Sequence, residues 1–95
     1  MPALWPQSAM SVAYDRPVDV LHITVGPLVP YEGDGLPGGV ELDFSLDDGA
    51  PCGAKVIGFQ KNGWIDRVPK LAKLIGKHLG VPASTIEQAI LDATA

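Results

Sequence analysis

Four acidic side chains in the first half of the sequence have the chemistry to bind a hard cation. Asp15 and Asp19 lie in an expected turn, and Glu41 and Asp43 lie on the same face of an expected strand. Clustered carboxylate oxygens suit such ions, but the spacing follows no known cation-binding loop. The same acids would also keep a sheet edge from pairing with another chain. Two interpretations therefore stay open, a metal- or ligand-binding site and solvated acids, and the sequence favours the second.

Cys52, His22 and His78 are the residues suited to nucleophilic catalysis. Cys52 follows a proline at an expected turn, His22 lies in an expected strand and His78 in an expected helix. The two histidines lack a metal-binding spacing, and a lone cysteine most often packs as a small hydrophobe. The glycines at 33–39 do not open a helix after a strand, as a phosphate-binding loop would. We expect no catalytic residue and no cofactor, and a binding domain rather than an enzyme.

The composition indicates one small domain. The chain has 95 residues, 46% of them hydrophobic, which is enough for a single core. Its one cysteine permits no internal disulfide, and no apolar run approaches the roughly 20 residues of a membrane-spanning helix. The N-terminus lacks a basic start that leads into an apolar segment. We expect a cytoplasmic protein with a flexible arm at 1–9 and one domain at 10–95.

The elements that must position these residues begin with a β-hairpin. Residues 40–46 alternate between apolar and polar side chains, which is typical of a half-buried strand. Turn residues at 47–49 lead into a second β-rich run at 52–59. Before this hairpin, 11–25 indicates β structure with a turn at 14–19, and 28–32 has the composition of a short edge strand. We expect a mobile loop at 33–39.

Two helices follow the sheet. The apolar residues of 67–79 recur with helical spacing, Asp66 is the expected N-cap, and Gly80 suits a left-handed stop. Ser84 and Glu87 have the spacing of a capping box that opens a second helix. The sequence therefore predicts an α+β fold: an antiparallel sheet of three or four strands at 10–59, with a helical hairpin at 64–94 packed on one face.

Several short motifs resemble a small bacterial family, domain-of-unknown-function family 2283. The resemblance covers about residues 10–59, at Tyr14-Asp15-x-x-x-Asp19-x-Leu21-His22-Ile23, Gly39-Val40-Glu41-Leu42-Asp43-Phe44 and Gly53-Ala54-Lys55-Val56-Ile57. His22 stands where the family favours Tyr, and Lys55 where it favours Glu. The resemblance implies a small antiparallel sheet with a helix on one face, and it implies no enzymatic activity. The C-terminal helix pair is an addition to the family pattern.

The segment at 68–93 also resembles a helix-turn-helix, with a glycine in its turn and a well-placed Ile86. A DNA-reading helix presents basic or amide side chains, but Ser84 to Ala93 contains Glu87 and Asp92 and no Lys or Arg. An ordinary pair of helices explains the segment better. Binding to DNA therefore remains an alternative.

The sequence favours an interaction module that associates with itself or with a small protein partner. Residues 1–60 carry eight acidic and two basic side chains, whereas 61–95 carry five basic and three acidic ones. Solvated charges on the outer face of each element explain this asymmetry best, and a basic stripe that meets an anionic partner is the alternative. We expect a homodimer because a small sheet with a proline-marked edge and an apolar helix pair would readily bury surface in one. The candidate contact residues are the two tryptophans and the lysines of the first helix, namely Trp5, Trp64, Lys70, Lys73 and Lys77.

Overall fold

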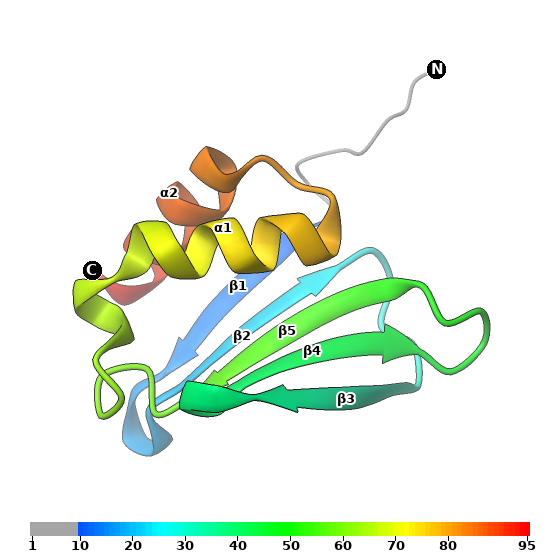
Figure 1. Ribbon diagram of the computed structural model, residues 1–95, viewed down its shortest axis with the longest axis horizontal. Helices are drawn as coiled ribbons and strands as arrows, with labels where there is room; N and C mark the ends of the chain where they lie inside the picture. Colours follow the sequence, from blue (N-terminus) through cyan, green and yellow to red (C-terminus); the bar gives the residue numbers. More distant parts are fainter. Residues whose placement is uncertain (1–9) are drawn as a thin grey trace.

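The computed structural model describes residues 10–95, so Trp5 and the expected arm at 1–9 lie outside the described part. Five antiparallel strands form one sheet in the order β1-β2-β5-β4-β3, and both long helices lie on one face of it (Figure 1). The elements are β1 (Met10–Asp15), β2 (Val20–Val25), β3 (Tyr31–Leu36), β4 (Val40–Ser45), β5 (Pro51–Ile57), α1 (Val68–Leu79) and α2 (Ala83–Thr94). The α+β class and the antiparallel sheet are confirmed, and the expected three or four strands become five.

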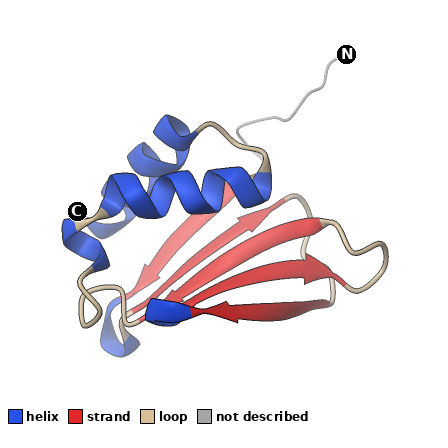
Figure 2. Ribbon diagram, viewed as in Figure 1, coloured by secondary structure: helices blue, strands red, loops and turns tan. Residues whose placement is uncertain are grey.

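Edge strand β3 begins inside the short edge strand expected at 28–32 and continues into the segment expected to be a mobile loop. It pairs with β4 along its whole length, from Tyr31 opposite Ser45 to Leu36 opposite Val40. Short one-turn helical segments join the neighbouring elements, including the one at Pro37–Gly39 between β3 and β4 (Figure 2). The expectation failed because Gly33 and Gly35 have low strand propensity, and pairing with β4 overrides that preference.

The expected turn between β1 and β2 is present and is organised around Asp19. This residue adopts the left-handed conformation, with φ 58°. Its carboxylate accepts hydrogen bonds from the Tyr14 hydroxyl at 2.6 Å and from the backbone N–H groups of Gln60 and Lys61 at 2.9 and 3.0 Å. Aspartate tolerates this backbone conformation better than most residues. Asp19 therefore joins the first hairpin to the segment that leads into the helices.

The helices lie close to their expected positions, but both expected caps are wrong. Asp66 belongs to a one-turn helix at Trp64–Asp66, and Arg67 occupies the N-cap of α1. Pro82 occupies the N-cap of α2, so Ser84 and Glu87 already lie inside that helix and form no capping box. Pro82 fixes the helix start, because its carbonyl accepts the first helical hydrogen bonds, from Thr85 and Ile86.

One hydrophobic core lies between the sheet and the helices. It is built from the inward side chains of β2, β5, α1 and α2, with Leu21, Ile23, Val56, Leu71 and Ile90 fully buried. Gly80 ends α1 in the left-handed conformation, as the sequence predicts. No helix among residues 10–95 has the length and apolarity to cross a membrane.

Candidate functional site

A cluster of polar side chains lies on the sheet face opposite the helices. Lys55 on β5 is at its centre, and its Nζ donates to Glu41 Oε2 at 3.1 Å and to Asp43 Oδ2 at 3.4 Å, both on β4. Lys55 Nζ also donates to the hydroxyl of Tyr31 on edge strand β3. Three strands therefore contribute to one charged group, which we call the Lys55 cluster: Tyr31, Glu41, Asp43 and Lys55.

The strand register explains how the cluster forms. Glu41 and Asp43 are two residues apart on β4 and so point to the same face. Glu41 lies directly opposite Lys55 on β5. Asp43 is opposite Gly53 on β5 and Gly33 on β3. Because neither glycine has a side chain, the acidic side chains have room to lie flat over the sheet and reach Lys55.

The electrostatic environment shifts the pKa values of the two carboxyl groups in opposite directions. Burial first, and then hydrogen bonding with Glu41, raises the pKa of Asp43 to about 6 against the attraction of Lys55. Hydrogen bonds with Asp43 and then Lys55 lower the pKa of Glu41. Burial lowers the pKa of Lys55, but the hydrogen bonds to Tyr31 and Glu41 and the charge of Asp43 outweigh it and raise that pKa. Lys55 therefore stays charged, and Asp43 takes up a proton before Glu41 does.

Asp43 is the most unusual member of the cluster. It is the buried charged residue of the described chain, with 4% of its surface exposed. Its Oδ1 atom has no hydrogen-bond partner among residues 10–95. Leaving a buried acceptor unpaired costs about 1–3 kcal/mol, and more when the group is charged. A buried carboxyl group whose pKa is shifted by burial and by charged neighbours marks a candidate functional site when it lines a pocket.

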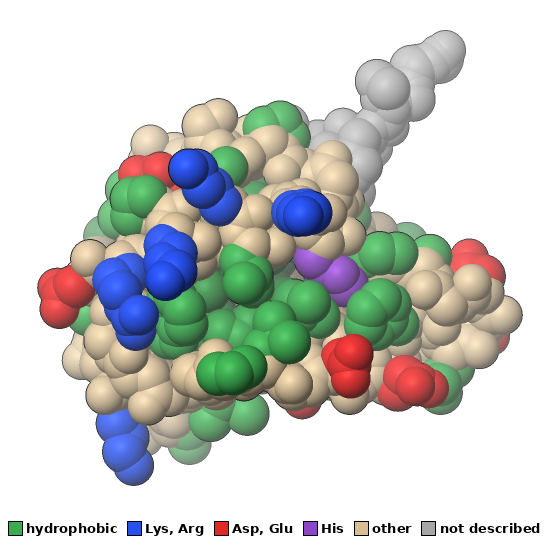
Figure 3. Space-filling model, in the orientation of Figure 1, with side chains coloured by type: hydrophobic (Ala, Val, Ile, Leu, Met, Phe, Trp, Pro, Cys, Tyr) green, Lys and Arg blue, Asp and Glu red, His purple; other side chains and the backbone are tan. Residues whose placement is uncertain are grey.

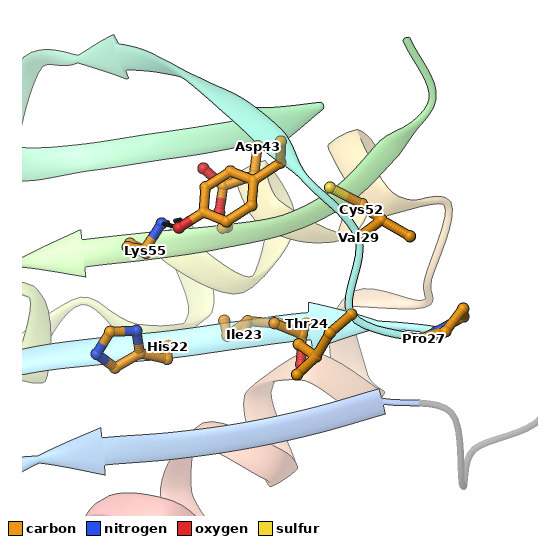
Figure 4. Close-up of a pocket in the computed structure, with 11 residues that line it drawn as sticks. His22, Ile23, Thr24, Pro27, Val29, Asp43, Cys52 and Lys55 are labelled. Carbon is orange, nitrogen blue, oxygen red and sulfur yellow. Dashed lines mark hydrogen bonds and ion pairs between the residues drawn. The ribbon is translucent and has the colours of Figure 1, made fainter. Parts of the chain in front are cut away.

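A pocket of about 230 Å³ adjoins the cluster. The connection at 26–30 forms one of its walls, because it carries the chain from β2 past β5 and β4 to the far edge of the sheet. Figure 4 shows Lys55 and His22 on neighbouring strands, Val29 of the connection beside Cys52, and Pro27 farther along, beyond Thr24. Polar and apolar groups share the lining: His22, Ile23, Thr24, Pro27, Leu28, Val29, Tyr31, Asp43, Cys52, Ala54 and Lys55.

Cys52 reaches this pocket through an irregularity in the sheet. The β4–β5 register shifts between Asp43 and Phe44, so that Phe44 pairs with Pro51 and Cys52 is the additional residue. Burial raises the pKa of the Cys52 thiol, and the negative charge of Asp43 adds to the effect. Cys52 therefore contributes a neutral, weakly polar wall to the pocket.

The structure divides the four expected acidic candidates. Glu41 and Asp43 come together in the Lys55 cluster, whereas Asp19 lies at the first turn with its carboxylate bound to three donors, and Asp15 is exposed beside it. Across residues 10–95, no three His, Cys, Asp or Glu side chains gather in a way that would hold a metal ion. The cluster instead contains a lysine, whose Nζ contacts Glu41 Oε2 and Asp43 Oδ2.

The other expected contact residues lie on the helical side. Trp64 is 7% exposed and donates from Nε1 to the Gly38 carbonyl at 2.7 Å, so it packs in the core. Lys70, Lys73 and Lys77 are exposed on α1. Figure 3 shows Lys and Arg side chains over the helical part of this face, hydrophobic side chains beside them, and acidic side chains beyond. The lysines are therefore accessible to a partner.

The expected helix-turn-helix segment forms a helical hairpin packed on the sheet. Gly76 allows a tight return, because a Cβ there would lie 2.6 Å from the carbonyl oxygen of Val81. His78 ties α1 to β4, with Nε2 3.1 Å from the Asp43 carbonyl and its ring 4.9 Å from that of Phe44. These contacts explain the segment through packing, and DNA binding stays a prediction.

Sequence reasoning missed Lys55, Tyr31 and the contribution of Thr24 and the 26–30 connection to one site. One signal was present: Glu41 and Lys55 lie on the polar faces of two strands joined by a hairpin. The exact register depends on the irregularity at Cys52, which the pattern of side chains does not reveal. The position of β3, and so of Tyr31, depends on pairing with β4, which the local sequence does not reveal.

Comparison with known proteins adds no relative. No protein-family model, no curated protein and no solved structure matches this chain. The resemblance of residues 10–59 to family 2283 therefore stays a prediction.

Proposed function

We propose that this protein is a small-molecule-binding domain, and that the ligand occupies the pocket beside the Lys55 cluster. The observation that carries the proposal is the buried, unpaired Oδ1 of Asp43 next to a pocket with apolar walls. Binding sites for small molecules combine apolar surfaces with a few well-placed polar groups in this way. The volume of about 230 Å³ exceeds the roughly 150 Å³ cavity that accommodates benzene.

A pocket-filling variant tests the proposal. Thr24 lines the pocket, and Ser11 lies directly opposite it on β1, exposed and outside the lining. We would titrate the full chain with benzyl alcohol, cyclohexanol and indole and follow backbone amide shifts by NMR. We expect shifts at Ile23, Cys52 and Ala54 that disappear in Thr24→Phe and persist in Ser11→Phe. Shifts elsewhere, or none with any of the three compounds, would contradict the proposal.

Self-association is a second candidate, because two surfaces of opposite charge flank partly buried apolar side chains. Leu36 and Leu42 are partly buried against the core on the helical side of the sheet. Glu32 and Asp34 of edge strand β3 project on that same side, since they pair with Phe44 and Leu42. Direct pairing of β3 with a second β3 would bring like charges together. We therefore propose that α1 of one copy, with its lysines, packs on the acidic edge of the other.

Charge-reversal variants of the two surfaces test this dimer. We expect sedimentation analysis to give a dimer at micromolar concentration that dissociates in Glu32→Lys/Asp34→Lys and in Lys70→Glu/Lys73→Glu. A mixture of the two variants restores a heterodimer, because the charges are again complementary. The pair Asp47→Lys/Asp48→Lys, at the exposed β4–β5 turn, makes the same charge change and leaves the dimer intact. A wild-type chain that stays monomeric would rule the candidate out.

A further inference from the structure

We infer that the ligand of this pocket is a small organic amine, with its ammonium group against the two carboxylates of the Lys55 cluster and its apolar part against the 26–30 connection. The inference rests on the proposed small-molecule function and specifies its ligand class. Three features carry it: the charge balance of the cluster, the unpaired acceptor on Asp43, and the distribution of polar and apolar walls.

The charge balance favours a cation. Glu41 and Asp43 supply two negative charges near neutral pH, and Lys55 supplies one positive charge. The cluster therefore keeps one unbalanced negative charge, on side chains that are 29%, 5% and 21% exposed for Glu41, Asp43 and Lys55. A charge that is partly removed from water requires a counter-charge or a proton. Burial first, and then the neighbouring Glu41, raises the pKa of Asp43, so an added positive charge beside it would stabilise its ionised form.

The hydrogen bonds of Lys55 and Asp43 favour a ligand that donates over an anionic one. Lys55 has three N–H donors, and it directs them to Tyr31, Glu41 and Asp43. While the Tyr31 hydroxyl keeps its contact with Lys55, no N–H of Lys55 is left for a carboxylate or phosphate of a ligand. Asp43 Oδ1, in contrast, is an acceptor without a donor. A ligand that complements this site must donate hydrogen bonds, and a charged donor forms the stronger ones.

Access to Asp43 is possible through Tyr31. Oδ1 has almost no contact with solvent, so neighbouring side chains must move before a donor reaches it. Tyr31 lies on the edge strand and is 45% exposed, and its hydroxyl and ring both contact Lys55 Nζ, the ring centroid at 4.1 Å. We infer that the exposed Tyr31 side chain rotates to admit the ligand, and the benzoate probe tests whether the Lys55 N–H released in this way attracts an anion instead. The Tyr31 ring then provides a face for the incoming ammonium group.

The walls select the rest of the ligand. Pro27, Leu28 and Val29 of the connection present apolar surface, and Leu28 is 88% exposed. His22 and Thr24, on β2 across from Lys55 and Gly53, supply polar groups on the other side of the pocket. The volume of about 230 Å³ accommodates one ring with a short side chain. Benzylamine has this size and shape, and benzyl alcohol and benzoate match it with a neutral and a negative head group.

The test compares these three probes on the full chain by amide NMR titration near pH 7.5. We expect benzylamine to bind about tenfold or more tightly than benzyl alcohol, which corresponds to a charge-assisted hydrogen bond replacing a neutral one, and benzoate to give no shifts at the pocket. Asp43→Asn keeps the side-chain shape, and we expect it to reduce benzylamine affinity to that of benzyl alcohol. Asp34→Asn removes an exposed acid from the opposite face of the sheet and should change nothing.

The outcomes separate this inference from the function on which it rests. If benzyl alcohol binds in the pocket as tightly as benzylamine, or benzoate binds more tightly, the amine is wrong while the small-molecule function holds. If benzylamine binds but neither Asp43→Asn nor Glu41→Gln weakens it, the cluster is not its site and the inference is overturned. If no probe binds at the pocket, including those used with Thr24→Phe, both fail.

Discussion

The carboxyl group of Glu41 lies over the backbone of Gly33 on the neighbouring strand. A Cβ built on Gly33 would overlap the Cγ, Cδ and Oε2 atoms of Glu41. Glu41 thereby occupies space that any other residue at position 33 would fill. A glycine on the edge strand therefore leaves room for the Glu41 carboxylate, whose Oε2 atom lies 3.1 Å from Lys55 Nζ.

We expect Gly33→Ala to displace the Glu41 side chain and break its contact with Lys55. The free energy of unfolding should fall by about 1 kcal/mol, the value of a partly exposed charged hydrogen bond. The pKa of Asp43 should also fall, because the hydrogen bond with Glu41 that raises it is lost. Urea denaturation and NMR of the side-chain carboxyl carbons measure the two effects.

Gly35 supplies the control for this prediction. It lies on the same face of the same strand, and a Cβ there would meet nothing within 4 Å. We expect Gly35→Ala to change stability by no more than about 0.5 kcal/mol. Equal effects of the two alanines would show that strand propensity, and not displacement of Glu41, is responsible.

The raised pKa of Asp43 makes stability depend on pH. An acid with a higher pKa in the folded protein binds its proton more tightly there than in the unfolded chain. Its stabilising contribution is complete below the ordinary pKa of 3.8 and is lost as the pH rises through about 6. We therefore expect Asp43→Asn to gain stability relative to wild type between pH 4 and pH 7.5, by about 1–3 kcal/mol.

Denaturation curves at a series of pH values test this directly. Asp47→Asn, at the exposed β4–β5 turn, is the reference for removing an ordinary acid. If the difference in the free energy of unfolding between Asp43→Asn and wild type stays constant with pH, or falls toward pH 7.5, then Asp43 titrates normally in the folded protein.

Asp19 should matter far more to the fold than Asp15. Its carboxylate accepts three hydrogen bonds, and these lower the pKa of Asp19. The hydrogen bond from the Tyr14 hydroxyl has the largest effect. We expect Asp19→Ala to lower the melting temperature more than Tyr14→Phe does, because the alanine loses all three bonds and strains the left-handed backbone. Asp15→Asn changes an exposed residue and should leave the melting temperature unchanged. The stabilisation by Asp19 is present above its ordinary pKa and is lost as the pH falls through the lowered one.

A substitution at Gly76 distinguishes the effect of tertiary packing on stability from that of helix propensity. Alanine is favoured over glycine within a helix by about 1 kcal/mol, so propensity alone predicts that Gly76→Ala stabilises α1. The Cβ would, however, lie 2.6 Å from the backbone oxygen of Val81. We expect a net loss of about 2 kcal/mol, as α1 and α2 move apart. Lys73→Ala, at an exposed site of the same helix, should change stability by about 0.5 kcal/mol or less. A stabilised Gly76→Ala would contradict the close approach.

Much of the fold follows from local patterns in the sequence. The alternation at 40–46 predicted β4, the helical spacing after Arg67 predicted α1, and Gly80 marked its end. These predictions hold because side-chain periodicity and backbone conformation are properties of a few neighbouring residues. The expected caps at Asp66 and Ser84 failed for a related reason. Arg67 and Pro82 occupy the cap positions, and cap spacing alone does not distinguish between adjacent candidates.

Tertiary structure alone decided the fifth strand and the site. β3 contains two glycines and becomes a strand only because β4 offers it a complete row of backbone partners. The Lys55 cluster joins residues 12, 14 and 24 positions apart, through a register that includes the irregularity at Cys52. The pocket wall exists because β2 and β3 are separated by two strands that the chain must pass. Sequence by itself therefore determined which residues are polar, apolar or able to turn, whereas the non-local pairing of strands determined which of them meet.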